Sequence, residues 1–128
     1  MSKQIINTDK APAPIGPYNQ AVKANGFLFV SGQVAFIPAT GELELSSIDS
    51  EAHQVMKNLS AVLEEAKITF DHVVKTTIFL SDMAFFAKVN EVYATYFKGD
   101  HPARETVAVK GLPRGVNVEI SVIAVVDL

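Results

Sequence analysis

The strongest repeating pattern of apolar positions lies over residues 48–66. Apolar side chains recur there at spacings of three and four, which places them on one face of an α-helix. Ser47 or Ser50 can cap the start of this helix, because a serine hydroxyl accepts a hydrogen bond from a free backbone N–H of the first turn. The apolar positions are Ala52, Val55, Met56, Leu59, Val62, Leu63 and Ala66.

A second helical pattern follows Asp82, whose carboxylate can cap it. The spacing of its apolar residues again predicts one buried face. These residues are Phe85, Phe86, Val89, Val92, Tyr93, Tyr96 and Phe97.

Five other segments are rich in β-branched and aromatic residues and predict strands. The first two are joined at Asn25-Gly26, a pair that tolerates positive φ and is typical of hairpins. The order ββ(β)αβαββ predicts an α+β fold of one domain, residues 1–128, with two helices on one face of a mostly antiparallel or mixed sheet. The expected strands span residues 19–24, 27–31, 72–80, 104–110 and 116–126.

The two faces of the last strand differ in polarity. One face is wholly apolar and must meet the helices: Val116, Val118, Ile120, Val122, Ala124 and Val126. The other face is half apolar: Asn117, Glu119, Ser121, Ile123, Val125 and Asp127. Because two helices cannot cover both faces, the pattern predicts a homo-oligomer in which another subunit covers the second face. A solvated face with two incidental aliphatic residues is the alternative.

Composition excludes several classes of function. The chain has no cysteine, no long apolar run of a membrane span or signal peptide, and a net charge of −3 with scattered lysines and arginines. We therefore expect a cytoplasmic protein with a small-molecule ligand rather than a nucleic acid or a membrane. The three histidines, His53, His72 and His101, have no metal-ligand spacing and are expected on the surface or in loops. No serine elbow or phosphate-binding loop is present either.

Two charged residues remain as candidates for chemistry. Arg104 opens a strand after Pro102, and alternation places Thr106 on its face and Glu105 on the opposite one. Such an arginine can clamp a carboxylate, although an ordinary surface arginine is the alternative. Glu119 lies in a largely apolar strand and needs a partner, a proton or a water molecule, unless it is an exposed edge residue.

Five motifs in register make the chain resemble the Rid family, in its RidA branch of reactive intermediate deaminases. They are Gly16-Pro17-Tyr18-Asn19-Gln20-Ala21, Val30-Ser31-Gly32-Gln33, Val89-Asn90-x-x-Tyr93, Pro102-Ala103-Arg104 and Val118-Glu119-Ile120. The resemblance implies a chorismate-mutase-like fold, assembled as a trimer around a central β-barrel, with three ligand sites in the clefts between subunits.

The resemblance also implies roles for individual residues. Arg104 would bind the substrate carboxylate, Glu119 would hold a water, and the backbone at Thr106 would face the ligand. The remaining substrate-binding residues would be Tyr18, Ser31, Gly32 and Asn90. Glu105 departs from the small residue usual after the arginine, which puts substrate preference in doubt.

The implied reaction is hydrolysis of 2-imino or 2-enamine acids, such as 2-aminoacrylate, 2-iminopropanoate and 2-iminobutanoate, to 2-keto acids and ammonia. No cofactor is implied, and the substrates would come from pyridoxal-phosphate enzymes. The alternative is a non-catalytic sensor that binds keto acids or amino acids in the same clefts, for which a water-holding Glu119 is unnecessary. Ribonuclease activity, attributed to some relatives, is opposed by the acidic balance and the absence of a histidine pair.

Overall fold

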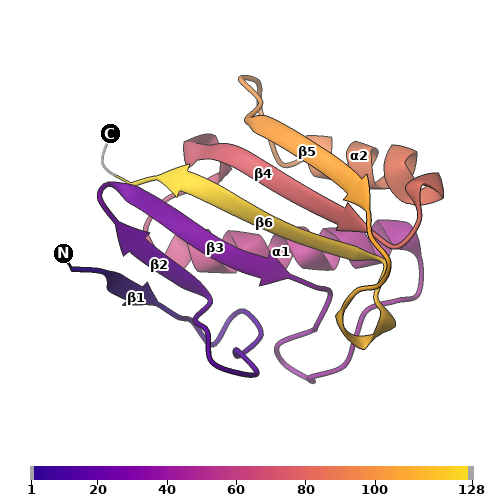
Figure 1. The fold of residues 1–128 in the computed structure, drawn as a ribbon, viewed down its shortest axis with the longest axis horizontal. Helices are drawn as coiled ribbons and strands as arrows, with labels where there is room; N and C mark the ends of the chain where they lie inside the picture. The colour runs from indigo at the N-terminus through magenta and orange to yellow at the C-terminus, as the bar shows by residue number, and fades with distance from the viewer. Residues whose placement is uncertain (1, 127–128) are drawn as a thin grey trace.

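Six strands form one mixed sheet in the computed structural model, which describes residues 2–126 (Figure 1). They are β1 (Gln4–Ile6), β2 (Ala21–Ala24), β3 (Phe27–Gln33), β4 (Val73–Leu80), β5 (Ala103–Ala108) and β6 (Val118–Val125). Their order across the sheet is β1-β2-β3-β6-β4-β5. Only β4 and β5 pair in parallel, and the other neighbours are antiparallel. The predicted α+β fold with a mixed sheet is confirmed.

The first helix, α1 (Ile48–Glu65), begins where the sequence predicts. Its cap is Ser47, whose hydroxyl oxygen accepts a hydrogen bond from the backbone N–H of Ser50 at 3.0 Å. The predicted apolar stripe is buried on the sheet, and Ala66 follows the helix as its C-terminal cap. The buried residues of the stripe are Ala52, Val55, Met56, Leu59, Val62 and Leu63.

The second helix, α2 (Phe86–Ala94), is shorter than predicted. Asp82 caps the 3₁₀ turn Met83–Phe85 that precedes it, by accepting a hydrogen bond from the N–H of Ala84 at 2.8 Å. Both helices cover the same face of the sheet, as Figure 1 shows. The expected apolar residues Tyr96 and Phe97 lie beyond the helix and still pack against the core.

The two faces of β6 differ as predicted. The residues facing the helices, from Val118 to Ala124 in steps of two, are all buried, whereas those between them are half-buried. The strand starts later than residue 116, because Glu51 of α1 accepts hydrogen bonds from the backbone N–H groups of Asn117 and Val118 at 2.7 and 3.1 Å. Asp127, expected on the second face, lies outside the described residues.

Other strand boundaries also differ from the expectation. The three residues of β1 are too few to give a pattern, so this strand was not predicted. β2 starts at Ala21 rather than residue 19, because the N–H of Gln20 donates to the side chain of Asn7 at 2.9 Å instead of to a strand. β5 ends at Ala108 rather than residue 110.

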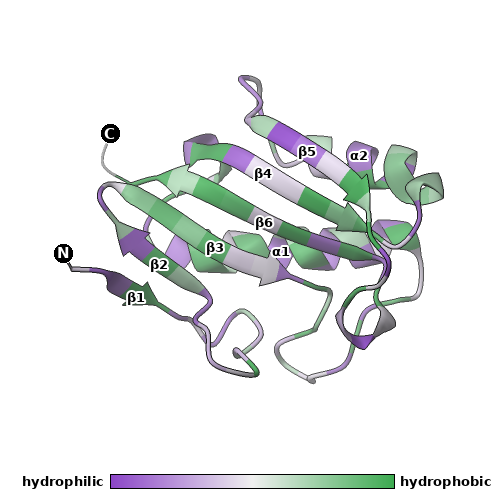
Figure 2. Cartoon of the chain, in the orientation of Figure 1, coloured by the Kyte–Doolittle hydropathy of each residue, from purple (hydrophilic) through white to green (hydrophobic). Residues whose placement is uncertain are grey.

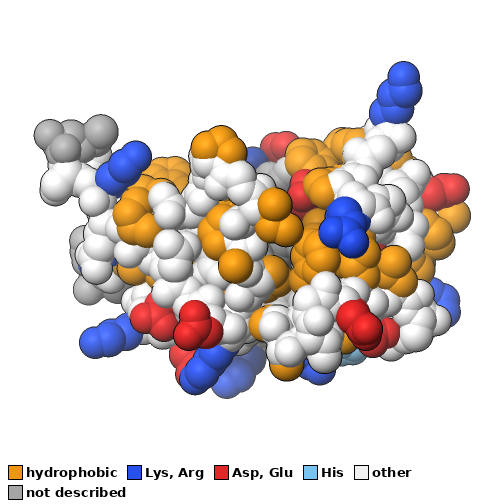
Figure 3. Space-filling model, turned by 90° about the horizontal axis from the view of Figure 1, so that it is seen from below, with side chains coloured by type: hydrophobic (Ala, Val, Ile, Leu, Met, Phe, Trp, Pro, Cys, Tyr) orange, Lys and Arg blue, Asp and Glu red, His pale blue; other side chains and the backbone are white. Residues whose placement is uncertain are grey.

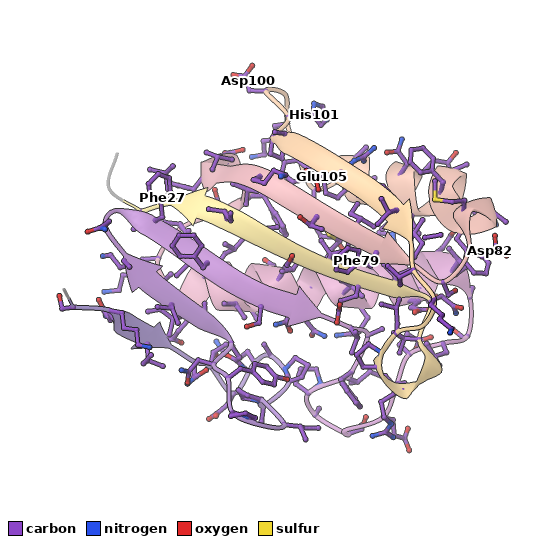
Figure 4. All side chains as sticks on the ribbon, in the orientation of Figure 1. Phe27, Phe79, Asp82, Asp100, His101 and Glu105 are labelled. Carbon is purple, nitrogen blue, oxygen red and sulfur yellow. The ribbon has the colours of Figure 1, made fainter. Side chains whose placement is uncertain are left out.

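The sheet face opposite the helices is uncovered and largely apolar. Phe27 and Phe29 of β3 are 42% and 47% exposed there, and they pair with Val125 and Ile123 of β6. Figure 2 shows hydrophobic residues along β3 and β6, and Figure 4 labels Phe27 at the start of β3. The predicted homo-oligomer is not tested by a single chain and stays a prediction. No helix within residues 2–126 is long and apolar enough to cross a bilayer.

Candidate functional site

A cavity of about 670 Å³ lies on the loop side of the molecule, where the segments before β2, after β3 and before β6 meet. Figure 3 views this side and shows hydrophobic side chains gathered over the loops, with lysine and arginine side chains among them. Four predicted site residues line the cavity: Tyr18, Ser31, Gly32 and Glu119. The structure therefore brings together residues that are up to about a hundred positions apart in the chain.

The end of β3 is irregular, and this irregularity presents Ser31 to the cavity. The pairing of β3 with β6 shifts register between Val30 and Gln33, and such bulges re-aim side chains. The Ser31 hydroxyl donates to the carbonyl of Asn19 at 2.6 Å, and its N–H donates to the carbonyl of Gln20 at 2.9 Å. Because its proton is used, the hydroxyl offers its lone pairs to a ligand.

Gly32 lies directly against the side chain of Glu119. A β-carbon at position 32 would be 2.8 Å from the carboxyl carbon of Glu119, closer than real β-carbons come. The glycine therefore leaves room for this carboxyl group in the cavity wall. Burial raises the pKa of Glu119 above its ordinary value, since desolvation disfavours the charged form. A carboxyl group with a raised pKa exchanges protons nearer neutral pH.

Gln20 clamps the proline-rich segment that forms one cavity wall. Its side chain is buried, and its amide nitrogen donates to the carbonyls of Thr8, Ala11 and Pro12 at 3.0, 3.3 and 2.8 Å. Its amide oxygen accepts from the N–H of Thr8 at 2.7 Å. Gln20 belongs to the motif of residues 16–21, but no role was predicted for its side chain. A glutamine directly before an apolar strand was the available signal.

Tyr18 stands at the mouth of the cavity and is 50% exposed. Its hydroxyl accepts a hydrogen bond from the N–H of Ile15 at 3.3 Å, which folds the segment back on itself. Gly16 between them adopts a φ of 125°, a conformation that favours glycine. The phenol thus keeps its proton available as a donor.

Arg104 does not line this cavity and lies on β5, beneath α2. Its Nη1 donates to Oδ1 of Asn90 at 2.6 Å, and its guanidinium carbon lies 5.7 and 5.1 Å from the ring centroids of Phe86 and Tyr93. These three partners are spaced four and three residues apart on α2, so one face of the helix holds the arginine. Hydrogen bonding and cation–π contact fix the guanidinium plane.

Tyr93 is the buried platform of this second cluster. Its hydroxyl donates to Oγ1 of Thr76 on β4 at 2.9 Å. Burial raises the pKa of Tyr93, and the Thr76 hydrogen bond and the Arg104 charge partly oppose the rise. The phenol therefore stays protonated, and the ring keeps a fixed position beneath the arginine.

Thr106 follows Arg104 by two residues on the same face of β5. Its hydroxyl oxygen is the only buried side-chain polar atom without a hydrogen-bond partner in the described part of the chain. Buried polar groups are normally paired, so this hydroxyl is free to meet a ligand, a water molecule or a second chain. From the sequence, only the backbone of Thr106 was expected to face the ligand.

The predicted site residues thus form two clusters that do not meet within one chain. Arg104, Asn90 and Thr106 do not line the cavity. Arg104 contacts the helix side of the sheet, whereas Glu119 belongs to the alternate, half-buried face of β6. In the part of the chain that the structure describes, no carboxylate lies within 4.0 Å of the Arg104 guanidinium.

Glu105 points away from Arg104, as alternation predicts. Its Oε1 accepts a hydrogen bond from Nζ of Lys75 at 3.0 Å. Figure 4 shows Glu105 on β5, beside the neighbouring β4. The Glu105 carboxylate is paired with Lys75 and does not compete with a substrate for the Arg104 guanidinium group.

The histidines take structural positions. Nδ1 of His53 lies 2.9 Å from the Tyr96 hydroxyl, so His53 is half-buried in α1 rather than in a surface loop. His72 bonds the N–H of Thr69 at 3.1 Å, and the His101 ring lies 5.9 Å from that of Phe97. Within residues 2–126, no three histidine, cysteine or acidic side chains gather as a metal site.

The fold and the two clusters define a class of small α+β proteins, in which one sheet carries two helices on one face and a loop-lined cavity at its end. The family model described as endoribonuclease L-PSP matches residues 8–126. The chain belongs to this family, which includes the Rid proteins, and the resemblance to the Rid family is confirmed.

Three relatives illustrate the similarity. A mouse 2-iminobutanoate/2-iminopropanoate deaminase is 49% identical, with 96% of this chain and 91% of that protein covered. The crystal structure of RidA from an Antarctic Psychrobacter is 42% identical with a TM-score of 0.92, covering 95% and 98% of the two chains. Escherichia coli TdcF with bound serine is 37% identical with a TM-score of 0.91, covering 95% and 98%. These matches agree with the chorismate-mutase-like fold.

Proposed function

We propose that this protein hydrolyses reactive 2-imino and 2-enamine acids to 2-keto acids and ammonia. The observation that carries the proposal is the chemistry of the two clusters. One presents an arginine fork without a carboxylate partner among the described residues, and the other presents a half-buried Glu119 beside a cavity. The deaminase name of the mouse relative supports the same reaction.

Arg104 binds the carboxylate of the substrate in this proposal. Asn90 takes one N–H of the guanidinium and the rings of Phe86 and Tyr93 hold its plane, so the remaining N–H groups point to a ligand in a fixed fork. The planar guanidinium group can donate two parallel hydrogen bonds to the two oxygens of a carboxylate. Because its contacts already fix its orientation, the group loses little conformational entropy on binding. The serine bound in TdcF also carries a carboxylate, which supports this ligand class.

Glu119 manages the proton of the attacking water. The enamine gains a proton at C3 and loses one from nitrogen, which gives the imine with an electrophilic C2. Water attacks C2 and gives a proton to Glu119, which passes it to the nitrogen, so that the carbinolamine forms. The carbinolamine hydroxyl then gives its proton, through Glu119, to the same nitrogen, the C2–N bond breaks, ammonia leaves, and the C2 carbonyl of the keto acid forms. Such positioning and proton transfer contribute about 10²- to 10⁴-fold.

The two clusters complete one site across a subunit boundary. We propose a homotrimer whose sheets enclose a central barrel, so that Arg104, Asn90 and Thr106 of one chain face Tyr18, Ser31, Gly32 and Glu119 of the next. The uncovered apolar face of the sheet, the unpaired Thr106 hydroxyl and the separation of the clusters all support this assembly.

The cellular setting follows from the chemistry. Reactive enamines form when pyridoxal-phosphate enzymes eliminate from hydroxylated amino acids, and we propose a functional link to such enzymes in the cytoplasm, without nucleic acid or membrane as partner. The absence of cysteine and the net charge of −3 suit this setting.

The test is keto-acid release from 2-aminoacrylate generated in place by a dehydratase. The wild type should accelerate release, and Arg104→Ala should lose about a hundredfold in kcat/KM because the carboxylate loses a charge-assisted bidentate partner. Lys57→Ala, which removes an exposed cation from α1, serves as the control and should retain full activity.

Release no faster than in buffer would reject deamination of this substrate. Binding of serine or keto acids by the same protein would then favour the sensor, for which the serine bound in TdcF is a precedent.

A further inference from the structure

Arg114 lines the cavity that holds Glu119 and takes no part in the proposed hydrolysis. Its guanidinium carbon lies 5.5 Å from the ring centroid of Phe36, so the side chain is stacked on an aromatic surface. Its backbone has φ 59° and ψ 18°, a left-handed conformation that a side-chain-bearing residue adopts at a cost. Strained residues of this kind cluster at ligand sites.

The aromatic partner of Arg114 and the chain that follows it are each bonded to a buried residue of α1. The carbonyl of Phe36 accepts a hydrogen bond at 2.8 Å from Nδ2 of Asn58, a buried residue of α1. On the other side, Asn117 follows Arg114 closely, and its backbone and side-chain nitrogens donate to the buried Glu51 at 2.7 and 2.9 Å. The exposed turn that carries Arg114 is therefore anchored three residues further on, at Asn117, and its aromatic partner Phe36 is anchored by Asn58.

The donors of the Arg114 guanidinium are unused within the described residues. The ion pair within 4.0 Å found there joins Lys75 to Glu105, and no side-chain hydrogen bond leaves Arg114. Glu119 lines the same cavity without pairing with it. An exposed cation that is stacked on an aromatic ring beside a cavity, with no anion within 4.0 Å among the described residues, can pair with an anionic group of a ligand.

We propose that Arg114 forms a second anion subsite, which binds the distal carboxylate of 2-imino dicarboxylic acids. The inference rests on the proposed function, in which Arg104 of the neighbouring chain takes the carboxylate next to the reacting carbon. With one arginine for each end, the site favours substrates that carry a second carboxylate at the end of the side chain. Arg114 then determines specificity and leaves the chemistry to Glu119.

The test compares two keto acids of equal length by isothermal titration calorimetry. 2-Oxoglutarate and 2-oxopentanoate share five carbons and differ at the distal end, where only the former has a carboxylate. The wild type should bind 2-oxoglutarate about tenfold more tightly, since tenfold corresponds to one charge-assisted contact of moderate strength. Arg114→Gln should reduce the preference to less than about twofold and leave 2-oxopentanoate binding unchanged.

Three controls make the result specific. Lys110→Gln removes a cation of the same connection between β5 and β6 that does not line the cavity, and should keep the preference. Arg104→Ala should weaken both ligands alike. Phe36→Leu keeps the arginine and removes its platform, so it should lower the preference even where Arg114→Gln fails to fold.

An equal preference in the wild type and Arg114→Gln, or no measurable binding of 2-oxoglutarate, overturns the subsite. Hydrolysis of 2-aminoacrylate is measured on the same samples. Hydrolysis without the preference would leave the proposed function standing and the subsite refuted. A preference for 2-oxoglutarate without hydrolysis of 2-aminoacrylate would leave the subsite standing and refute the proposed function.

Discussion

Gly32 and Glu119 fit together so closely that the size of one determines the place of the other. A β-carbon on Gly32 would lie 2.8 Å from the carboxyl carbon of Glu119 and 3.1 Å from its Oε2. The two residues come from β3 and β6, whose pairing becomes irregular between Val30 and Gln33. The bulge, the glycine and the glutamate thus form one structural unit at the cavity.

Substituting this glycine should move the carboxyl group without unfolding the chain. In Gly32→Ala the flexible Glu119 side chain gives way, and we expect kcat for imine hydrolysis to fall about 10- to 100-fold, because the proton acceptor leaves its position. Gly111→Ala is the matched control, since a β-carbon there meets nothing within 4 Å. Equal activity of the two variants would contradict the role of this contact.

The raised pKa of Glu119 predicts how stability depends on pH. The unfolded chain releases this proton at the ordinary glutamate pKa, whereas the folded chain keeps it to higher pH because of burial. Between those two pKa values the folded state binds more protons, so its free energy of unfolding falls as pH rises. Glu119→Gln should remove this decline. Urea unfolding of the wild type and Glu119→Gln over a pH series tests this prediction. If the free energies of unfolding of the two proteins change in parallel with pH, the raised pKa of Glu119 is refuted.

Tyr93 should act on substrate affinity through Arg104. Tyr93→Leu removes the ring 5.1 Å from the guanidinium, and we expect KM to rise about tenfold with a smaller change in kcat, because the fork loses its fixed plane. Tyr93→Phe keeps the ring and loses only the bond to Thr76, so its KM should stay near that of the wild type. Steady-state kinetics test this prediction. An equal rise of KM in both variants would show that the Tyr93 hydroxyl, rather than the ring beneath Arg104, determines substrate affinity.

Gln20 should stabilise the cavity wall. Gln20→Ala leaves the carbonyls of Thr8, Ala11 and Pro12 without their shared donor, which should cost about 1–3 kcal/mol of unfolding free energy. Hydrogen exchange should rise most in residues 8–18. Gln4→Ala, at an exposed position of β1, is the comparison and should change neither quantity appreciably. Unchanged exchange in that segment would show that other contacts hold it.

The sequence predicted the features that depend on local periodicity. The apolar stripe of α1, its Ser47 cap and the alternation of β6 follow from side-chain direction alone, and the structure has all three. The opposite directions of Arg104 and Glu105 follow from the same rule. The roles of site residues came from motifs matched to a family, not from periodicity.

Features that depend on tertiary contacts could not be predicted in this way. The late start of β6 is set by Glu51, which lies 66 positions from Asn117 in the chain. The clamp by Gln20 and the stacking of Arg114 on Phe36 also join distant segments. In the sequence, Glu51, Gln20 and Arg114 cannot be distinguished from ordinary polar surface residues, because their partners are brought to them only by the fold.

The central claim is that one active site is built from two chains, and subunit complementation tests it most directly. Arg104→Ala and Glu119→Gln each damage a different cluster and should each be inactive alone. Coexpressed with different tags and purified as mixed trimers, they should recover about a third of wild-type activity on 2-aminoacrylate, because one of the three sites in each mixed trimer pairs an intact Arg104 with an intact Glu119. Mixed trimers as inactive as their parents would contradict a shared site.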